Sequence, residues 1–156
     1  MDLINNRTKE IAGLALDGLY ERSKAISANT ANSLTPNYQR KEVSFEGSLR
    51  EIIKRENEKE QLKIQNSNTY AQNAQELLKG QSCAQIAFMN SQVNEGYNID
   101  IQNDMTDPYD ENGNNVNIET EMMDEAKTGM RYQVIANLLS KSYNGLSSII
   151  QGQTQG

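Results

Sequence analysis

The C-terminal third of the chain carries a repeat that constrains the fold more than any other feature. Its positions alternate spacings of four and three, and they are Ile118, Met122, Glu125, Gly129, Tyr132, Ala136, Leu139, Tyr143, Leu146 and Ile150. A mean spacing of about 3.5 residues is that of a left-handed coiled-coil seam. Asn117 is placed to cap the helix, and Glu119 and Glu121 put negative charge in its first turn, where the helix dipole favours it. The sequence therefore predicts a long C-terminal helix.

The first 33 residues carry a second helical pattern. One broad apolar stripe includes Ile11, Leu16, Leu19 and Ile26. A smaller apolar patch lies on another face, so this helix should contact more than one neighbour. The helix should end before Thr35-Pro36, because proline lacks a backbone donor and disfavours helix in the preceding residue.

Two amides lie near the end of this first helix. Asn29 and Asn32 are three residues apart, so a helix through them would place both on one face. Small polar side chains at this position predict either a surface for close contact or an ordinary weak helix end.

The middle of the chain is less regular. A short helix is expected within residues 45–57, followed by a mixed-charge run that suits a solvated helical face or a linker. Residues 66–82 fit helix or loop. Alternating apolar residues at Ile86/Phe88 and Tyr97/Ile99/Ile101, around Asn94-Glu95-Gly96, predict a small β-hairpin.

An acidic stretch precedes the C-terminal helix. Residues 95–125 contain ten Asp and Glu and no Lys or Arg. The spacing of Asp110, Asn112, Gly113 and Glu119 partly matches a calcium loop, but Pro108 stands at the first ligand position and has no side-chain oxygen. A tight turn at Asn112-Gly113 fits better.

Composition excludes several classes of function. The chain has 156 residues, of which 36% are hydrophobic, with no Trp and no His, and its net charge is −6. The absence of His removes the commonest general base, and the net negative charge argues against nucleic acid. A single cysteine, Cys83, makes no disulfide framework, and a buried or incidental role fits it better than a reactive one. We expect no catalytic, cofactor-binding or metal site, no secretory signal peptide and no membrane-spanning segment.

Two motifs at opposite ends of the chain resemble one family. "ANTANSLTPNYQRKEVSF" is similar to the N-terminal signature of bacterial flagellar rod and hook proteins, with Asn37 in place of the usual Gly. "GNNVNIETEMMDEAKTGMRYQVIANLLSKSYNGLSSII" is similar to the C-terminal helix of the proximal-rod member of that family. Since Asn tolerates left-handed backbone better than most residues, the turn around Asn37 should survive.

The resemblance implies a mainly α fold in which the terminal helices pair as an antiparallel, coiled-coil-like unit. The expected organisation is an N-terminal rod helix over residues 1–35, a middle segment over 36–116, a C-terminal rod helix over 117–151 and a tail over 152–156. The middle segment contains the signature turn, the short helix, the small hairpin and the acidic turn. Thr35, Pro36 and Tyr38 form the signature turn.

The implied function is that of a structural subunit of the proximal rod, which transmits motor torque and conducts exported subunits. The implied partners are other rod proteins, copies of itself, the adaptor between the MS ring and the rod, and the flagellar type III export apparatus. The implied location is the basal body in the periplasmic space, reached without a cleaved signal peptide. Alternatives are another proximal-rod paralogue and a free-standing two-helix coiled-coil adaptor.

The expected assembly interface combines both helices. Its residues are Ile11, Leu16, Leu19, Ile26, Asn29, Asn32, Met122, Tyr132, Ala136, Leu139, Tyr143, Leu146 and Ile150.

Overall fold

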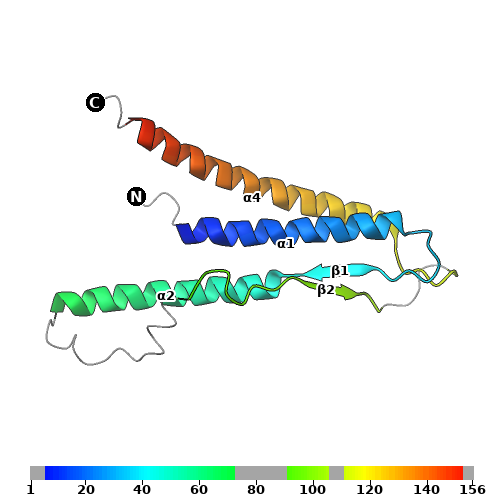
Figure 1. The fold of residues 1–156 in the computed structure, drawn as a ribbon, viewed down its shortest axis with the longest axis horizontal. Helices are drawn as coiled ribbons and strands as arrows, with labels where there is room; N and C mark the ends of the chain where they lie inside the picture. Colours follow the sequence, from blue (N-terminus) through cyan, green and yellow to red (C-terminus); the bar gives the residue numbers. More distant parts are fainter. Residues whose placement is uncertain (1–5, 73–90, 106–110, 153–156) are drawn as a thin grey trace.

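In its described part the chain folds as three long helices and a small two-stranded sheet. The computed structural model describes residues 6–72, 91–105 and 111–152. In chain order the elements are α1 (Asn6–Ala31), β1 (Lys41–Ser44), α2 (Glu46–Gln72), β2 (Asp100–Asn103) and α4 (Ile118–Gly152). Figure 1 shows α1 and α4 side by side and running in opposite directions, with α2 along the other side of α1 in this view. The predicted class, mainly α with paired terminal helices and a small β element, is confirmed.

Helix α1 contacts three other elements. It packs most extensively against α4 and also contacts β1 and α2. The prediction that a helix with two apolar faces touches more than one neighbour is therefore confirmed. The helix ends at Ala31, and the backbone N–H of Asn32 donates to the carbonyls of Ala28 and Asn29 at 3.1 Å.

Helix α4 begins as the sequence predicts. The side-chain oxygen of Asn117 accepts hydrogen bonds from the backbone N–H groups of Glu119 and Thr120, at 2.9 and 3.3 Å. These bonds satisfy two of the donors that a helix start leaves free, so Asn117 is the N-cap. Glu119 and Glu121 stand in the first turn, where their charge complements the helix dipole.

The sheet differs from the predicted hairpin. β2 overlaps the predicted second strand, but its antiparallel partner is β1, with Lys41 opposite Asn103 and Ser44 opposite Asp100. The turn at residues 93–96 is present, and Gly96 has a φ of 81° there. Ile86 and Phe88 lie outside the described residues. Pairing with β1 lets Val43 and the adjoining Phe45 face α1, so burial of these residues selects the partner.

Helix α2 is longer than the predicted short helix, and the mixed-charge run continues it. Part of that run is buried, contrary to the solvated face expected. Glu56 and Lys59 are nearly inaccessible and form an ion pair at 2.6 Å, while Lys59 also donates to the carbonyl of Ser91 at 2.8 Å. Arg55 donates to the carbonyls of residues 92, 93 and 95, so α2 holds the following turn through its cations.

The apolar core lies between α1 and the sheet. Leu19, Ala25, Val43 and Phe45 form its buried cluster, and Leu49, Tyr97, Ile99 and Ile135 pack against it. Gly18 lets α1 approach the Phe45 ring closely, because a Cβ at this position would overlap the ring atoms. The hydroxyl of Tyr97 donates to the carbonyl of Leu14 at 2.5 Å, which anchors the segment before β2 to α1.

Candidate functional site

A buried set of polar side chains joins the two terminal helices at the end where the chain reverses. We call it the polar junction: Asn29, Arg40, Asn114, Asn115 and Glu121. Both Asn29 and Glu121 have 0% exposure. Because a buried polar group is costly unless it is hydrogen-bonded, the partners of each residue decide whether the junction stabilises the fold.

The Asn29 amide bonds on both of its sides. Its Nδ2 donates to the carbonyl of Lys41 at 2.9 Å and to Oε2 of Glu121 at 3.1 Å. Its Oδ1 accepts from the backbone N–H of Lys41 at 2.8 Å and from the Tyr38 hydroxyl at 3.3 Å. Burial, and then the Glu121 carboxylate, raise the pKa of Tyr38, which keeps its hydroxyl a donor. Asn29 thus connects α1, the signature turn, β1 and α4.

Arg40 neutralises the carboxylates at the start of α4. Its Nε donates to Oε1 of Glu121 at 2.5 Å, and its other nitrogens lie 3.4 Å from Asp124 and 3.6 Å from Asp104. Burial by itself lowers the pKa of Arg40, but the hydrogen bond and the charge of Glu121 outweigh it, and the pKa is raised. The guanidinium therefore keeps its charge, and the Glu121 carboxylate has a charged partner in its buried position.

Asn114 fixes the signature turn. Its Nδ2 donates to the carbonyls of Asn32, Ser33 and Thr35, at 2.9, 3.0 and 2.9 Å. These carbonyls lie beyond Ala31, where α1 ends, and those of Asn32 and Thr35 also accept backbone hydrogen bonds from Thr35 and Tyr38. Asn114 therefore holds the turn that follows α1 from the other end of the sequence.

The two turns that meet here both use left-handed backbone. Asn37 has a φ of 58° and Gly113 a φ of 81°. The backbone N–H of Asn37 donates to the carbonyl of Asn112 at 3.0 Å. The predictions that Asn37 tolerates this conformation and that Asn112-Gly113 forms a tight turn are confirmed. Thr35 and Pro36 are exposed in the signature turn, and Tyr38 is half-buried.

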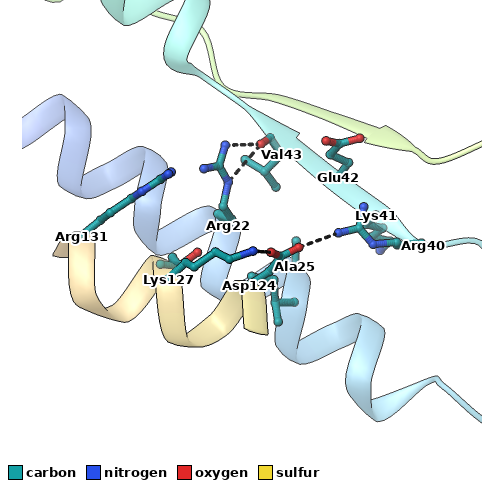
Figure 2. Close-up of a pocket in the computed structure, with 11 residues that line it drawn as sticks. Arg22, Ala25, Arg40, Lys41, Glu42, Val43, Asp124, Lys127 and Arg131 are labelled. Carbon is teal, nitrogen blue, oxygen red and sulfur yellow. Dashed lines mark hydrogen bonds and ion pairs between the residues drawn. The ribbon is translucent and has the colours of Figure 1, made fainter. Parts of the chain in front are cut away.

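A recess with a volume of about 310 Å³ lies beside the junction, between α1, β1 and α4 (Figure 2). Three of its cations have carboxylate partners: Arg22 with Glu46, Arg40 with Glu121, and Lys127 with Asp124. The two others are Lys41 and Arg131, and the side chains of both are without a carboxylate partner among the described residues. The carboxylates of Glu42 and Asp124 also line the recess, so its positive charge is partly compensated.

In the described part of the chain, no group of three His, Cys, Asp or Glu side chains is placed to hold a metal ion. Asp110 of the calcium-loop comparison lies outside that part. Among the described helices, none is both long and apolar enough to cross a membrane.

The expected assembly residues divide into three groups by burial. Leu19, Ile26 and Asn29 are buried within the chain, and Ile11, Leu16, Asn32, Ala136 and Leu139 are half-buried. Met122, Tyr132 and Tyr143 are exposed, and the side chains of Leu146 and Ile150 lie outside the described part. Asn29 was expected to serve a contact between subunits. Within the chain its amide is buried and bonds to Lys41, Tyr38 and Glu121, and a contact with a second subunit stays a prediction.

The face of α4 that packs inward is offset from the predicted seam. Its buried side chains are polar: Glu121, Thr128 and Ser142. Glu125 accepts a hydrogen bond from the Ser23 hydroxyl of α1 at 2.8 Å. The pairing of α1 with α4 therefore combines polar contacts with the apolar packing of Ile135. Met122, Tyr132 and Tyr143 of the apolar seam remain exposed on the monomer.

Sequence reasoning did not assign a structural role to the junction. The motif that carries the C-terminal resemblance contains Asn114, Asn115 and Glu121, and Arg40 follows the signature turn. The period of the apolar residues does not predict which side chains these residues bond to. One sequence signal could have predicted the ion pair. Glu121 and Asp124 lie on one face of a helix shortly after the Asn112-Gly113 turn, and Arg40 lies shortly after the signature turn.

Comparison with known proteins points in one direction. The chain is 27% identical over 131 residues to the flagellar basal body rod protein FlgB of Bacillus subtilis, covering 84% of this chain and 83% of that protein. It is 25% identical over 145 residues to FlgB of Borreliella burgdorferi, covering 93% and 96% respectively. Both relatives are flagellar rod proteins. None of the protein-family models matches the chain. Over most of its length the chain is therefore similar to FlgB proteins.

Proposed function

We propose that the chain is a structural subunit of the proximal rod of the bacterial flagellar basal body. The observation that carries the proposal is its similarity to two FlgB proteins over 84% and 93% of its length. The polar junction supports it, because the two sequence motifs that resemble rod proteins meet there through Asn29, Asn114 and Glu121. In this proposal the chain assembles with other rod proteins and copies of itself and contacts the adaptor between the MS ring and the rod. It reaches the periplasmic part of the basal body through the flagellar type III apparatus.

The monomer leaves apolar surface that assembly would cover. Met122 is 66% exposed and Tyr143 is 57% exposed, both on the seam predicted from the period of α4. Exposed apolar side chains that gather along one side of a helix are typical of an interaction surface. A subunit that completes its burial only among neighbours fits this surface better than an isolated globular protein does.

The test is deletion of the gene in the source bacterium. We expect normal growth, loss of external flagella and loss of swimming in soft agar, with recovery when the wild-type gene is restored. A deletion strain that swims would contradict the rod function.

Two variants connect the phenotype to the surface. Met122→Asp alters an exposed side chain, so the monomer should unfold at the wild-type temperature while swimming is lost. Leu139→Asp alters a half-buried side chain and should lower both the unfolding temperature and swimming, because burying a carboxylate without a partner is costly. Full motility with Met122→Asp would remove the seam from the proposed interface.

The free-standing two-helix adaptor remains the alternative from another class of function. It predicts a stable dimer in dilute solution that buries Met122, Tyr132 and Tyr143, whereas the rod proposal predicts a monomer. Sedimentation velocity on the dilute full chain distinguishes the two.

A further inference from the structure

A second unpartnered surface lies on the other side of α4 from the seam. It is an open groove with a volume of about 390 Å³, and Leu19 of α1 forms part of its floor. Phe45 and Leu49 line one wall, and Met130 and Val134 of α4 line the other. Met130 is 63% exposed and Val134 is 59% exposed, so this apolar surface is open to a ligand.

The groove continues into the positively charged recess. Arg131 lines both of them, and Figure 2 shows its side chain reaching from α4 across the recess. Arg131 is exposed and makes no ion pair among the described residues. Glu46 also lines the groove, but its carboxylate pairs with Arg22. The combined surface is therefore apolar at one end and carries the guanidinium of Arg131 at the other, which suits an amphipathic segment with an exposed carboxylate.

The chain itself contains such a segment in the first turns of α4. Ile118 and Met122 are exposed there, at 43% and 66%. Glu119 lies between them, is exposed, and its carboxylate has no partner in the described part of the chain. Within one molecule Glu119 and Arg131 stand on different sides of α4, three turns apart, so they cannot pair with each other.

We propose that the groove of one copy receives the first turns of α4 of a second copy, with Glu119 of one copy paired to Arg131 of the next. Ile118 and Met122 then fill the apolar half against Phe45, Leu49 and Val134. The two complementary surfaces are different, so the contact is heterologous: each copy both offers a helix and accepts one. Association of this kind grows into an open chain or a ring and does not stop at a two-fold dimer.

The inference names one partner for the proposed rod subunit and rests on the proposed function for its setting. The contact itself is measured without a flagellum. Sedimentation equilibrium of the purified full chain should show weak, concentration-dependent growth beyond a dimer, and added salt should reduce it because the contact includes exposed charges. A chain that stays monomeric at the highest concentration, or stops at a dimer, overturns the proposal.

A charge swap identifies the pair. Arg131→Glu and Glu119→Arg should each weaken association by roughly tenfold, because like charges then meet in every contact. The double variant should associate nearly as well as wild type, since every copy carries both changes. Lys54→Glu, a reversal of an exposed charge on α2 away from the groove, is the matched control and should change nothing. Single variants that associate normally, or a double variant that is not restored, overturn the pairing.

Two further measurements separate the possible failures. Thermal unfolding of Arg131→Glu should match wild type, because this side chain is exposed and has no ion pair among the described residues. Glu119→Arg also reverses a charge that favours the start of α4, so its unfolding temperature should fall slightly, and the double variant should show the same fall. In the deletion strain, full swimming with Arg131→Glu overturns the contact and leaves the rod function standing. A deletion strain that swims rejects the rod function, and the charge swap in solution then decides the contact alone.

Discussion

Nε of Arg40 donates to Oε1 of Glu121 at 2.5 Å, and this bond joins the segment leading into β1 to the first turn of α4. The side chain of Glu121 has 0% exposure and that of Arg40 has 17%. A carboxylate this deeply buried stabilises the fold only while its cation and its amide partner, Asn29, remain in place. Through this ion pair the position of α4 depends on Arg40, a residue in the first third of the chain.

Removing the cation should therefore cost more than neutralising the anion. Arg40→Met leaves the Glu121 carboxylate buried with only Asn29, and we expect a loss of about 3–5 kcal/mol in the free energy of unfolding. Glu121→Gln keeps the shape and loses a charge-assisted bond worth about 1.5–3 kcal/mol. Urea denaturation followed by circular dichroism measures both. Arg50→Met, at an exposed position of α2, is the control. Equal, small losses for the two junction variants would mean that water already reaches the pair.

The two asparagines at the end of α1 should differ in how much each contributes to the free energy of unfolding. Asn29→Ala removes an amide that bonds to Lys41, Glu121 and Tyr38, so we expect a loss of about 2–4 kcal/mol, since each bond left unmade strands a buried partner. Asn32 is half-buried, and its bonds are local, to the carbonyl of Ala28 and the hydroxyl of Thr35. Asn32→Ala should cost less than about 1 kcal/mol. The unfolding temperatures of the two variants, measured side by side, test this difference. If Asn29→Ala is more stable than Asn32→Ala, the Asn29 amide does not contribute to the network as described.

Two glycines of α1 make a matched pair. Gly13→Ala should stabilise the chain by up to about 1 kcal/mol, because alanine favours helix and nothing lies within 4 Å of the added carbon. Gly18→Ala gains the same propensity but drives its methyl into the Phe45 ring. Overpacking of this kind costs about 1–3 kcal/mol, so the net change should be a loss. Relative to wild type, the unfolding temperature should rise for Gly13→Ala and fall for Gly18→Ala. A rise for both variants would show that the Phe45 ring can move away from the added methyl.

The ion pair between Glu46 and Arg22 should make stability depend on pH. Burial raises the pKa of Glu46, but the hydrogen bond from Arg22, the backbone N–H groups and the Arg22 charge outweigh it, and the pKa lies below its ordinary value of 4.5. A folded-state pKa below the unfolded one means that the contribution is present above the ordinary value and is lost as the pH falls through the lowered value. The unfolding temperature of Glu46→Gln should lie below wild type at pH 7, and the gap should close in acid.

A second variant controls for the effect of removing one negative charge from the chain. Glu51→Gln neutralises an exposed carboxylate of α2 that has no partner in the described residues. Its unfolding temperature should track wild type at both pH values. A gap for Glu46→Gln that persists in acid would assign its effect to packing, not to ionisation.

Sequence periodicity predicted the two terminal helices, α1 and α4, because their signals are local. The N-cap of α4 at Asn117 is set by side-chain bonds to residues two and three positions on, and the turn at Asn37 is set by the conformational tolerance of one residue. Both follow from the chain within a few positions of the feature. The end of α1 before Pro36 follows for the same reason.

The features that periodicity missed all depend on partners far along the chain. The β1–β2 pairing joins residues about sixty positions apart, and an alternating pattern alone does not choose between possible partners. Glu56 and Lys59 read as surface residues until the segment beginning at Ser91 covers them. The inward face of α4 includes Glu121 and Glu125, which accept hydrogen bonds from Asn29 and Ser23 of α1, so the period of the apolar residues alone did not mark the whole helix contact.

The core combines residues from both ends of the chain, so it cannot be completed until the C-terminal part has been synthesised. Phe45 and Leu19 are covered by Tyr97, Ile99 and Ile135, and the turn that follows α1 is held by Asn114. A nascent chain emerges from its N-terminus, so everything through α2 is made before any of these covering residues exists. The first half of the protein therefore leaves the ribosome without a complete core, and its apolar residues stay accessible to a chaperone until α4 has been added.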